Sequence, residues 1–264
     1  MPIFNFEKTQ IFFEDYGTGI PIVFIHPPAM GRKVFHFQSQ LSDRFRVIFP
    51  DLSGHGDSIG PSRDVSIMGY AQEIKGLIEH LQISKAVVCG YSSGGLIALE
   101  FALSFPDHTS AVILASGFPE VKSVALKYEH LMGMYFVKKF PRLLAKLISQ
   151  SHSRDKSLRD EIYEHMLKTD RKTWFRYYEE SLHYSCVERL QLLKVPLFLL
   201  YGSRDFATQN IKIFKKKLSF QLAIIKHVAH QIPTKKWEIF NEHITDFVTE
   251  QENENKNKTS HSYE

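Results

Sequence analysis

Short apolar runs of β type alternate with helical patterns along most of this chain. Strands that alternate with helices are joined by crossover connections, which place the strands parallel in one sheet with helices on its faces. The alternation therefore predicts an α/β fold with a mostly parallel central sheet. Two earlier β-type segments, 4–6 and 11–16, predict a short antiparallel hairpin at the sheet edge. The apolar runs cover residues 22–25, 47–49, 86–89, 111–115, 197–201 and 223–225, and helical periodicity is clearest at 67–81, 94–104, 210–218 and 235–250.

The alternation stops between residues 118 and 195. This interval has no clear strand and is dominated by helical patterns rich in Leu, Met, Phe and Tyr. We therefore predict one α/β core built from residues 1–117 and 196–250, with residues 118–195 inserted as a helical cap. Residues 251–264 are polar and lack periodicity, so we expect a disordered tail there. A single domain of this kind is common at a length of 264 residues.

Composition and charge narrow the class of protein. Hydrophobic residues make up 43% of the chain and charged residues 23%, as in an ordinary globular protein. No apolar stretch approaches the roughly 20 residues that span a bilayer, and the N-terminus lacks the basic-then-apolar order of a signal peptide, so we expect a cytoplasmic location and no membrane span. The two cysteines, Cys89 and Cys186, do not make a disulfide framework and are expected to be buried. The net charge of +4 is spread along the chain, and its densest run, residues 215–217, lies at helical spacing beside apolar residues, which favours a solvated helix face over nucleic-acid binding.

One junction between a predicted strand and a predicted helix has the pattern Gly-Tyr-Ser-Ser-Gly at residues 90–94. A sharp turn at this place needs neighbours without bulky Cβ substituents, so that the turn closes and the hydroxyl of Ser92 projects outward. The N-terminus of the following helix offers backbone N–H groups to a developing negative charge. The pattern therefore predicts Ser92 as a nucleophile, and the alternative is an ordinary glycine-rich turn.

A serine hydroxyl needs a base to take its proton and a third group to orient that base. Among the 13 histidines, His230 follows the final predicted strand and precedes a long helix, which places it at the carboxyl ends of the parallel strands. His26, in the loop after an earlier strand, is its competitor. Asp205 directly follows another strand and is the predicted acid, although such a position also suits a helix N-cap. Glu120, beyond the strand at 111–115, is the second candidate for the acid.

These motifs resemble those of the α/β-hydrolase superfamily, and the resemblance covers most of the chain outside the cap and the tail. Residues 51–58 look like the D-x-x-G-x-G-x-S turn of that superfamily, 90–94 like its nucleophile elbow, and 201–205 like its acid loop. The resemblance implies a catalytic triad of Ser92, Asp205 and His230.

The sequence departs from the superfamily in the loop that supplies an oxyanion donor. Relatives have His-Gly-x after the first central strand, whereas this chain has His-Pro-Pro-Ala-Met-Gly at residues 26–31. Proline has no N–H to donate. We therefore expect one oxyanion donor from the Ser93 N–H and a second from Ala29, the nearest residue after the prolines that has an N–H. The alternative is a site with a single donor.

The combined features predict a serine hydrolase that cleaves a small or medium carboxylic ester through an acyl-enzyme on Ser92, with no cofactor and no metal. Its expected partner is a small ester-type substrate rather than a nucleic acid. The same triad could instead serve C–C bond hydrolysis, lactone opening or acyl transfer, because fold resemblance does not choose among them. A ligand receptor with slow turnover is the alternative outside enzymes.

Overall fold

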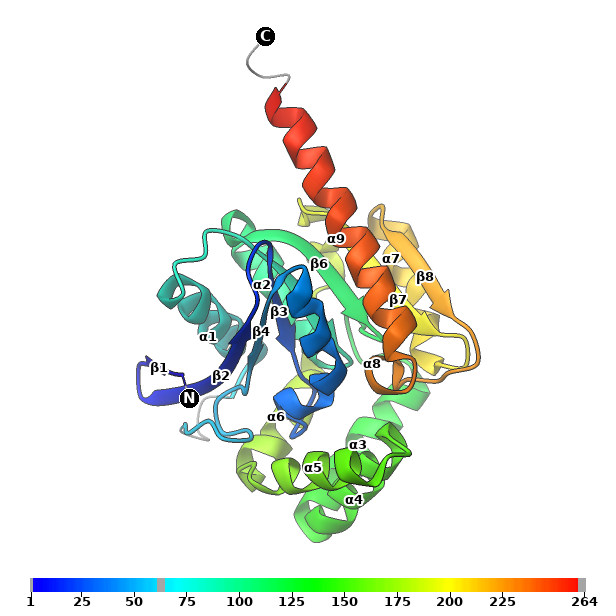
Figure 1. Cartoon of the computed structure of the whole chain (residues 1–264). Coiled ribbons are helices and arrows are strands. Elements are labelled where there is room, and N and C mark those ends of the chain that lie inside the picture. Colours follow the sequence, from blue (N-terminus) through cyan, green and yellow to red (C-terminus); the bar gives the residue numbers. More distant parts are fainter. Residues whose placement is uncertain (1, 61–64, 261–264) are drawn as a thin grey trace.

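A single sheet of eight strands runs through the described part of the chain (Figure 1). The structure is a computed structural model that describes residues 2–60 and 65–260. The strand order is β1–β2–β4–β3–β5–β6–β7–β8; β2 is antiparallel to β1 and β4, and all other neighbours are parallel. The strands are β1 (Ile3–Phe6), β2 (Thr9–Tyr16), β3 (Pro21–Ile25), β4 (Arg46–Pro50), β5 (Ala86–Tyr91), β6 (Thr109–Ala115), β7 (Leu197–Gly202) and β8 (Gln221–Ile225).

The arrangement confirms the predicted α/β class. Each of the six apolar runs lies in one of the strands β3 to β8, and the predicted hairpin forms β1 and β2 at the sheet edge. The central strands are continuous apolar runs because helices cover both faces of a parallel sheet. β5, for example, is buried at every position.

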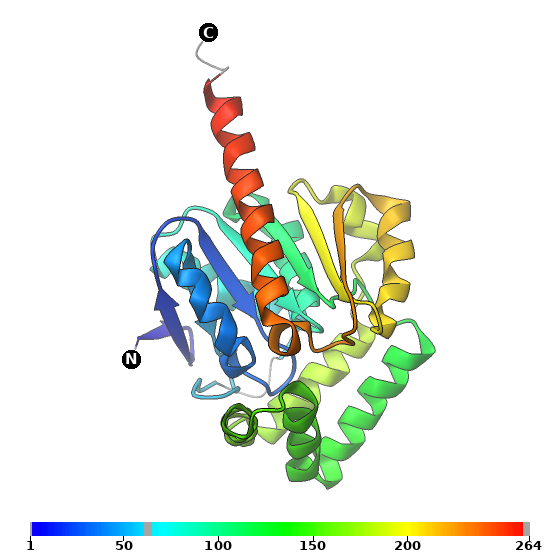
Figure 2. The ribbon, with the colours of Figure 1, turned by 45° about the vertical axis from the view of Figure 1, so that its right-hand side comes forward.

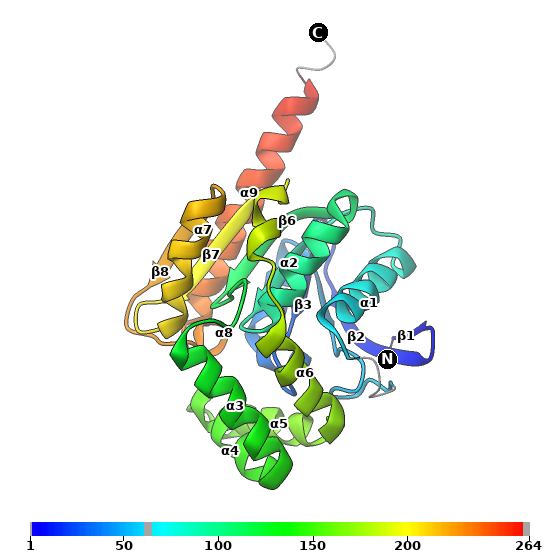
Figure 3. The same cartoon turned by 180° about the vertical axis from the view of Figure 1, so that it is seen from behind.

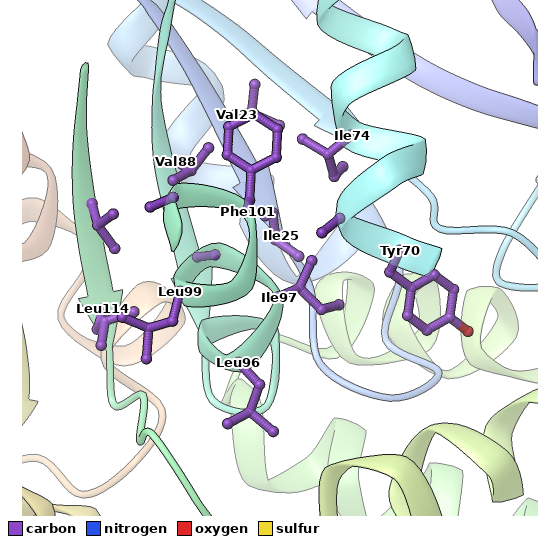
Figure 4. Packing of buried hydrophobic residues seen from close by; sticks show 14 of the residues in the cluster. Val23, Ile25, Tyr70, Ile74, Val88, Leu96, Ile97, Leu99, Phe101 and Leu114 are labelled. Carbon is purple, nitrogen blue, oxygen red and sulfur yellow. The ribbon is translucent and has the colours of Figure 1, made fainter. Parts of the chain in front are cut away.

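Helices on the two sides of the sheet bury two hydrophobic clusters. Successive strand residues point to opposite faces, so that Val23 packs with α1 and α2 while Ile22 belongs to the cluster beneath η1, α8 and α9. Figure 4 shows Ile74 of α1 with Ile97 and Phe101 of α2 over the first of these faces. The helices on the two faces together are α1 (Ile67–His80), α2 (Gly94–Ser104), α7 (Ile211–Lys217), α8 (Ile232–Lys235) and α9 (Trp237–Ser260), with the short 3-10 helices η1 (Arg32–Asp43), η2 (Pro106–His108) and η4 (Phe206–Asn210).

Between β6 and β7 the chain leaves the sheet and forms four helices. They lie at the end of the sheet to which the parallel strands point (Figures 1 and 3). Ser123, Asp155 and Asp170 cap three of them, each accepting a hydrogen bond from a backbone N–H of the first turn. We call residues 124–183 the helical insertion; they fall inside the interval that the sequence assigns to a cap. The helices are α3 (Val124–Lys139), α4 (Pro141–His152), α5 (Lys156–Leu167) and α6 (Arg171–His183), and η3 (Val187–Leu192) follows them.

The last helix corrects the expectation of a disordered tail from residue 251 onward. α9 continues to Ser260, and of the predicted tail residues 261–264 lie outside the described residues. The extension projects beyond the body of the protein, away from the helical insertion (Figure 2). Its polar residues do not oppose a helix that is already nucleated on the sheet, because adding a residue costs far less than nucleation. A Glu252–Lys256 ion pair (2.6 Å) one turn apart supports the added turns.

Two further expectations concern the cysteines and the membrane. Cys89 and Cys186 are free and buried, as predicted. None of the helices in the described ranges has both the length and the apolar character that a bilayer crossing requires.

Candidate active site

The turn between β5 and α2 holds Ser92 in a strained backbone conformation. Its φ is +53°, in the left-handed region that side chains with a Cβ rarely adopt. A Cβ at Gly90 would lie 2.5 Å from the carbonyl oxygen of Gly94, and one at Gly94 would clash with the carbonyl of Ile25. Close approaches of the backbone therefore require glycine at both positions, two residues before and two residues after Ser92.

The structure brings His230 and Asp205 together. The Nδ1 atom of His230 lies 3.2 Å from both carboxylate oxygens of Asp205. Because a carboxylate only accepts hydrogen bonds, Nδ1 carries the hydrogen and Nε2 is left as the basic nitrogen. Asp205 also accepts a hydrogen bond from the Ala207 N–H (2.8 Å) and caps η4. The carboxylate therefore has both of the roles that its position after a strand suggested.

Two aromatic rings and an unpaired nitrogen define the surroundings of His230. The rings of Tyr91 and Phe206 lie 5.4 and 6.1 Å from its imidazole, and the Phe206 ring is parallel to it. The Nε2 atom is buried and has no hydrogen-bond partner among the described residues. A buried polar atom without a partner is uncommon and costs free energy. This nitrogen is therefore available to accept a proton from a group that enters or rotates into the site.

The charges around His230 alter its pKa and that of Asp205. Burial disfavours the imidazolium, but the hydrogen bond and charge of Asp205, together with the charge of Glu129, outweigh burial and raise the pKa of His230 above its ordinary value. Burial would raise the pKa of Asp205, but its hydrogen bond to His230 and the charge of that imidazolium lower it. Asp205 is therefore ionised at neutral pH, as a group that stabilises an imidazolium must be.

Ser92 and His230 line one cavity of about 160 Å³ that lies between the core and the helical insertion. The insertion provides one wall, mostly from the helices α3 and α4, with Tyr178 of α6. The lining residues are Pro27, Pro28, Met30, Tyr91, Ser92, Ser93, Phe206, His230 and Gln231 from the core, and Glu129, His130, Ile148, Ser151, His152 and Tyr178 from the insertion.

Two histidines of this wall bind the residues on either side of Ser92. The Nε2 atom of His130 lies 3.3 Å from the Ser93 hydroxyl, and that of His152 lies 3.0 Å from the Tyr91 hydroxyl. In both rings Nδ1 lies 2.8 Å from a carbonyl of the same helix, so Nδ1 carries the hydrogen and Nε2 accepts. Burial lowers the pKa of both histidines to about 4, so both are neutral at pH 7. No spacing pattern in the sequence distinguishes these two histidines from the other eleven.

The loop after β3, where the sequence predicts the second oxyanion donor, has an unusual conformation. Pro27, Pro28 and Met30 line the cavity, but Ala29 is not among its described lining residues. Ala29 is fully buried with a φ of +65°, and its carbonyl accepts a hydrogen bond from the Thr169 hydroxyl (3.2 Å). The N–H of Met30 donates to the carbonyl of Pro27 (3.3 Å). The prolines and Met30 thus form the wall, and Ala29 packs against the insertion.

The competing candidates for the base and the acid have other partners. Glu120 accepts a hydrogen bond from the Ser185 hydroxyl (3.1 Å), and the backbones of the same two residues form an isolated β-bridge. His26 is fully buried, and its Nε2 accepts a hydrogen bond from the Leu52 N–H (3.0 Å), so that it orders the loops around it. Both residues do lie beyond strand ends, but the hydrogen bonds of their side chains stabilise neighbouring loops.

A buried ion cluster joins the turn at residues 51–58 to α5. Asp51 contacts the guanidinium of Arg32 and lies 3.0 Å from Nε2 of His165, and Arg32 also contacts Asp57 (2.8 Å). Asp51, Asp57 and His165 lie within 4.8 Å of one another, a spacing that could hold a metal ion. Because Arg32 already supplies the positive charge between the two carboxylates, the cluster is better explained as an ion-pair network that attaches the insertion to the core.

The chain is similar to known proteins of one family. Residues 32–237 match the family described as serine aminopeptidase, S33. An uncharacterized protein of Mycobacterium bovis is 34% identical over 117 residues, which cover 44% of this chain and 34% of that protein. The match thus spans about a third of the length of this curated relative.

Two solved structures have a similar fold. A thermophilic esterase from Thermogutta terrifontis superimposes with a TM-score of 0.80 at 22% identity, over 92% of this chain and 94% of that one. An enol-lactonase from Burkholderia xenovorans has a TM-score of 0.82 at 20% identity, over 94% of this chain and 100% of that one. Identities of this size show a shared fold and leave the reaction of this chain to be argued from its own residues.

Proposed function

We propose that this chain, which belongs to the serine aminopeptidase S33 family and has the α/β-hydrolase fold, is a serine hydrolase that cleaves a small or medium carboxylic ester through an acyl-enzyme on Ser92. The observation that carries the proposal is the buried Nε2 atom of His230. It has no partner among the described residues, its ring is oriented by Asp205 at Nδ1, and it shares one cavity with Ser92 on a strained turn.

In the proposed reaction the Ser92 hydroxyl attacks the ester carbonyl while Nε2 of His230 accepts its proton. The imidazolium that forms is stabilised by the ionised Asp205. His230 then gives the proton to the leaving alcohol, and Ser92 retains the acyl group. A water molecule, deprotonated by His230 in turn, attacks the acyl-enzyme. The bond between the acyl carbon and Ser92 Oγ then breaks, His230 returns the proton to Oγ, and the acid is released.

The oxyanion of each tetrahedral intermediate needs backbone donors. We propose the Ser93 N–H as one of them, because Ser93 stands at the N-terminus of α2, where the first N–H groups have no intrahelical partner. Ala29 remains the proposed second donor, and this requires its N–H to turn toward the cavity when substrate binds. A structure with a phosphonate on Ser92 tests this: a working donor lies about 2.7–3.1 Å from the phosphonyl oxygen, and an Ala29 nitrogen outside that range would leave a single-donor, slower enzyme.

The size of the cavity favours small acyl groups. Its volume of about 160 Å³ is below the roughly 300–1,000 Å³ typical of ligand pockets. We therefore expect kcat/KM to fall as the acyl chain of a chromogenic ester is lengthened. Lactones belong in the same panel, because a lactone is a cyclic ester that the same steps open.

Neighbouring serines provide a matched pair of variants. Ser92→Ala should abolish ester turnover and labelling by a fluorophosphonate, whereas Ser93→Ala keeps the backbone N–H and should retain both. Asp205→Asn should lower kcat by about four orders of magnitude, as loss of the correct histidine tautomer does. Labelling that survives in Ser92→Ala, or a larger loss of kcat in Glu120→Gln than in Asp205→Asn, would refute the assignment. Rapid labelling of the wild type without turnover of any ester would favour a ligand receptor.

A second candidate is removal of an N-terminal residue from a short peptide. The observation that favours it is Glu129, whose side chain lines the cavity near His230 and could pair with a free ammonium group. Aminoacyl arylamides with a free and with an acetylated amine distinguish the two reactions. Cleavage of the free amine alone, lost in Glu129→Gln, would support the peptidase.

A further inference from the structure

The outer sides of α3 and α4 form an exposed apolar surface. At 3.6 residues per turn, Val124, Tyr128, Leu131 and Tyr135 share the side of α3 that is opposite to its buried residues. Seven of the sixteen exposed large apolar side chains in the described residues lie on these two helices and their junction, with exposed fractions between 45% and 87%. We call this set the outer apolar face: Val124, Tyr128, Leu131, Tyr135, Phe140, Leu143 and Leu147.

The face is continuous across the junction of the two helices. The ring of Tyr135, at the end of the α3 stripe, contacts that of Phe140 with centroids 6.5 Å apart. Phe140, Leu143 and Leu147 follow at spacings of three and four residues, which place them on one side of α4. Isolated apolar side chains are normal on a protein surface, whereas a connected group marks an interaction site.

The charges around this face have one sign. Between residues 122 and 150 the chain has six Lys and Arg residues and one acidic residue, Glu129, which lines the cavity on the inner side. Lys127, Lys139, Arg142 and Lys146 are exposed, and none of them forms an ion pair with an acidic side chain of the described residues. Lys156 of α5 and Lys168, which directly follows that helix, are by contrast paired with Asp160 and Asp57, each at 2.7 Å.

We propose that the outer apolar face binds the surface of a membrane that contains anionic lipids. Apolar side chains bordered by Lys and Arg suit the boundary between the lipid headgroups and the acyl chains. There the apolar side chains enter the acyl region, and the Lys and Arg side chains pair with lipid phosphates. A second copy of the chain is a poorer occupant, because it would bring the same unpaired cations into opposition. Anionic lipid neutralises the cations and covers the apolar groups at the same time.

Membrane binding through the outer apolar face would also affect where the cavity lies. The same two helices that present the outer apolar face contribute Glu129, His130, Ile148 and His152 to the wall around Ser92. Binding at the outer side therefore brings the cavity next to the membrane, where apolar esters concentrate. The membrane proposal itself does not depend on the chemistry of Ser92, so Ser92→Ala should bind vesicles as well as the wild type does.

Co-sedimentation of the full chain with phosphatidylcholine vesicles, with and without phosphatidylglycerol, tests the proposal. The wild type should partition onto the anionic vesicles at least about tenfold better, since each cation near an anionic surface contributes roughly fivefold. Lys139→Glu/Arg142→Glu should remove that preference, and Leu131→Asp/Tyr135→Asp should weaken binding by about tenfold or more. These two double variants should keep the far-ultraviolet dichroism of the wild type and its hydrolysis of a water-soluble ester.

Two matched controls separate this face from general charge and apolar effects. Lys215→Glu/Lys216→Glu makes the same charge change in the exposed basic run of α7, and Leu192→Asp changes an exposed apolar residue of η3. Both should bind anionic vesicles as the wild type does. Equal binding to both kinds of vesicle, equal losses in the controls, or a dimer in analytical ultracentrifugation that Leu131→Asp/Tyr135→Asp dissociates would each overturn the proposal.

Discussion

The two halves of the helical insertion are attached to the core by different kinds of contact. The α5–α6 half, residues 156–183, is joined by contacts to charged groups: Nε2 of His165 lies 3.0 Å from the Asp51 carboxylate, and Glu161 of α5 pairs with Lys33 (2.8 Å). Backbone contacts reinforce it, because the Tyr177 hydroxyl donates to the carbonyl of His26 (3.1 Å) and the Asp170 N–H donates to that of Gly54 (2.9 Å). The α3–α4 half, residues 124–152, reaches the turn around Ser92 through two neutral imidazoles.

The difference assigns different roles to the halves. A hydrogen bond to a charged group such as the Asp51 carboxylate contributes about 1.5–3 kcal/mol, whereas a neutral hydrogen bond contributes about 1 kcal/mol net. The α5–α6 half is therefore the rigid support of the loop at residues 26–31 and of the turn at 51–58. The α3–α4 half is the weaker attachment, and it also contributes most of the insertion's residues to the cavity wall and has the outer apolar face.

Acid should have the largest effect, because both the core and the α3–α4 half depend on buried neutral histidines. Burial lowers the pKa to about 4 for His26, His130 and His152 and to about 3 for His55. Between pH 6.5 and 4 the unfolded chain binds protons that the folded chain does not, so stability falls as the pH falls. Glu73, whose pKa burial raises to about 7, and His230, whose pKa Asp205 raises, act in the opposite direction, but the four histidines held neutral by burial outweigh them. Urea unfolding at pH 7 and pH 5 should differ by several kcal/mol, on the order of 1.4 per unit of pKa shift.

A variant of His130 measures how much the α3–α4 half contributes to this loss of stability in acid. His130→Gln can keep hydrogen bonds to Ser93 and to the carbonyl of Leu126 but cannot titrate, so the loss of stability between pH 7 and pH 5 should be smaller than in the wild type. His183→Gln, at an exposed histidine of α6, is the matched control and should leave the loss unchanged. An equal acid sensitivity of His130→Gln and wild type would show that His130 is not held neutral in the folded state.

Removing the charge of Asp51 should have the next largest effect, through the α5–α6 half. Asp51→Asn leaves Arg32 and His165 without their shared carboxylate, and we expect a loss of about 3–5 kcal/mol in the free energy of unfolding at pH 7. Glu161→Gln is the control, because it removes a partly exposed partner of Lys33 and should cost less than about 1 kcal/mol. If Asp51→Asn unfolds within about 1 kcal/mol of the wild type, the ion cluster does not make this half the stronger attachment.

The sequence predicts the core better than the insertion for a physical reason. In β3 to β7 both faces are covered, so the strands are continuous apolar runs, and the turns at their ends need glycines such as Gly90 and Gly94. These signals are local. The tail was mispredicted because a polar segment such as residues 251–260 continues as a helix when the preceding turns are anchored by buried residues, among them Phe240 and Phe247.

The residues of the candidate site show the same difference: those from the core could be predicted from the sequence, and those from the insertion could not. Asp205 and His230 are brought together as strand-end positions predict, because neighbouring parallel strands end at one edge of the sheet. Glu129, His130 and His152 could not be found, since their contacts depend on how the insertion packs over that edge, which no local pattern specifies. The triad and the Ala29 donor stay predictions until the variants and the phosphonate complex are measured.

The smallest expected effect tests whether the weaker half of the insertion influences the chemistry of the core. The charge of Glu129, on α3, raises the pKa of His230 in addition to the larger contribution of Asp205. In the proposed mechanism His230 must be neutral to act as a base, so kcat/KM rises with pH around the pKa of the free enzyme. Glu129→Gln should therefore move this rising limb to lower pH and make the variant relatively more active on its acidic side. Glu164→Gln, at an exposed position of α5, should leave the limb in place. A limb that stays in place or moves to higher pH in Glu129→Gln would show that α3 contributes a wall to the cavity but no charge to the base, and the two halves would then differ only in how firmly they are attached.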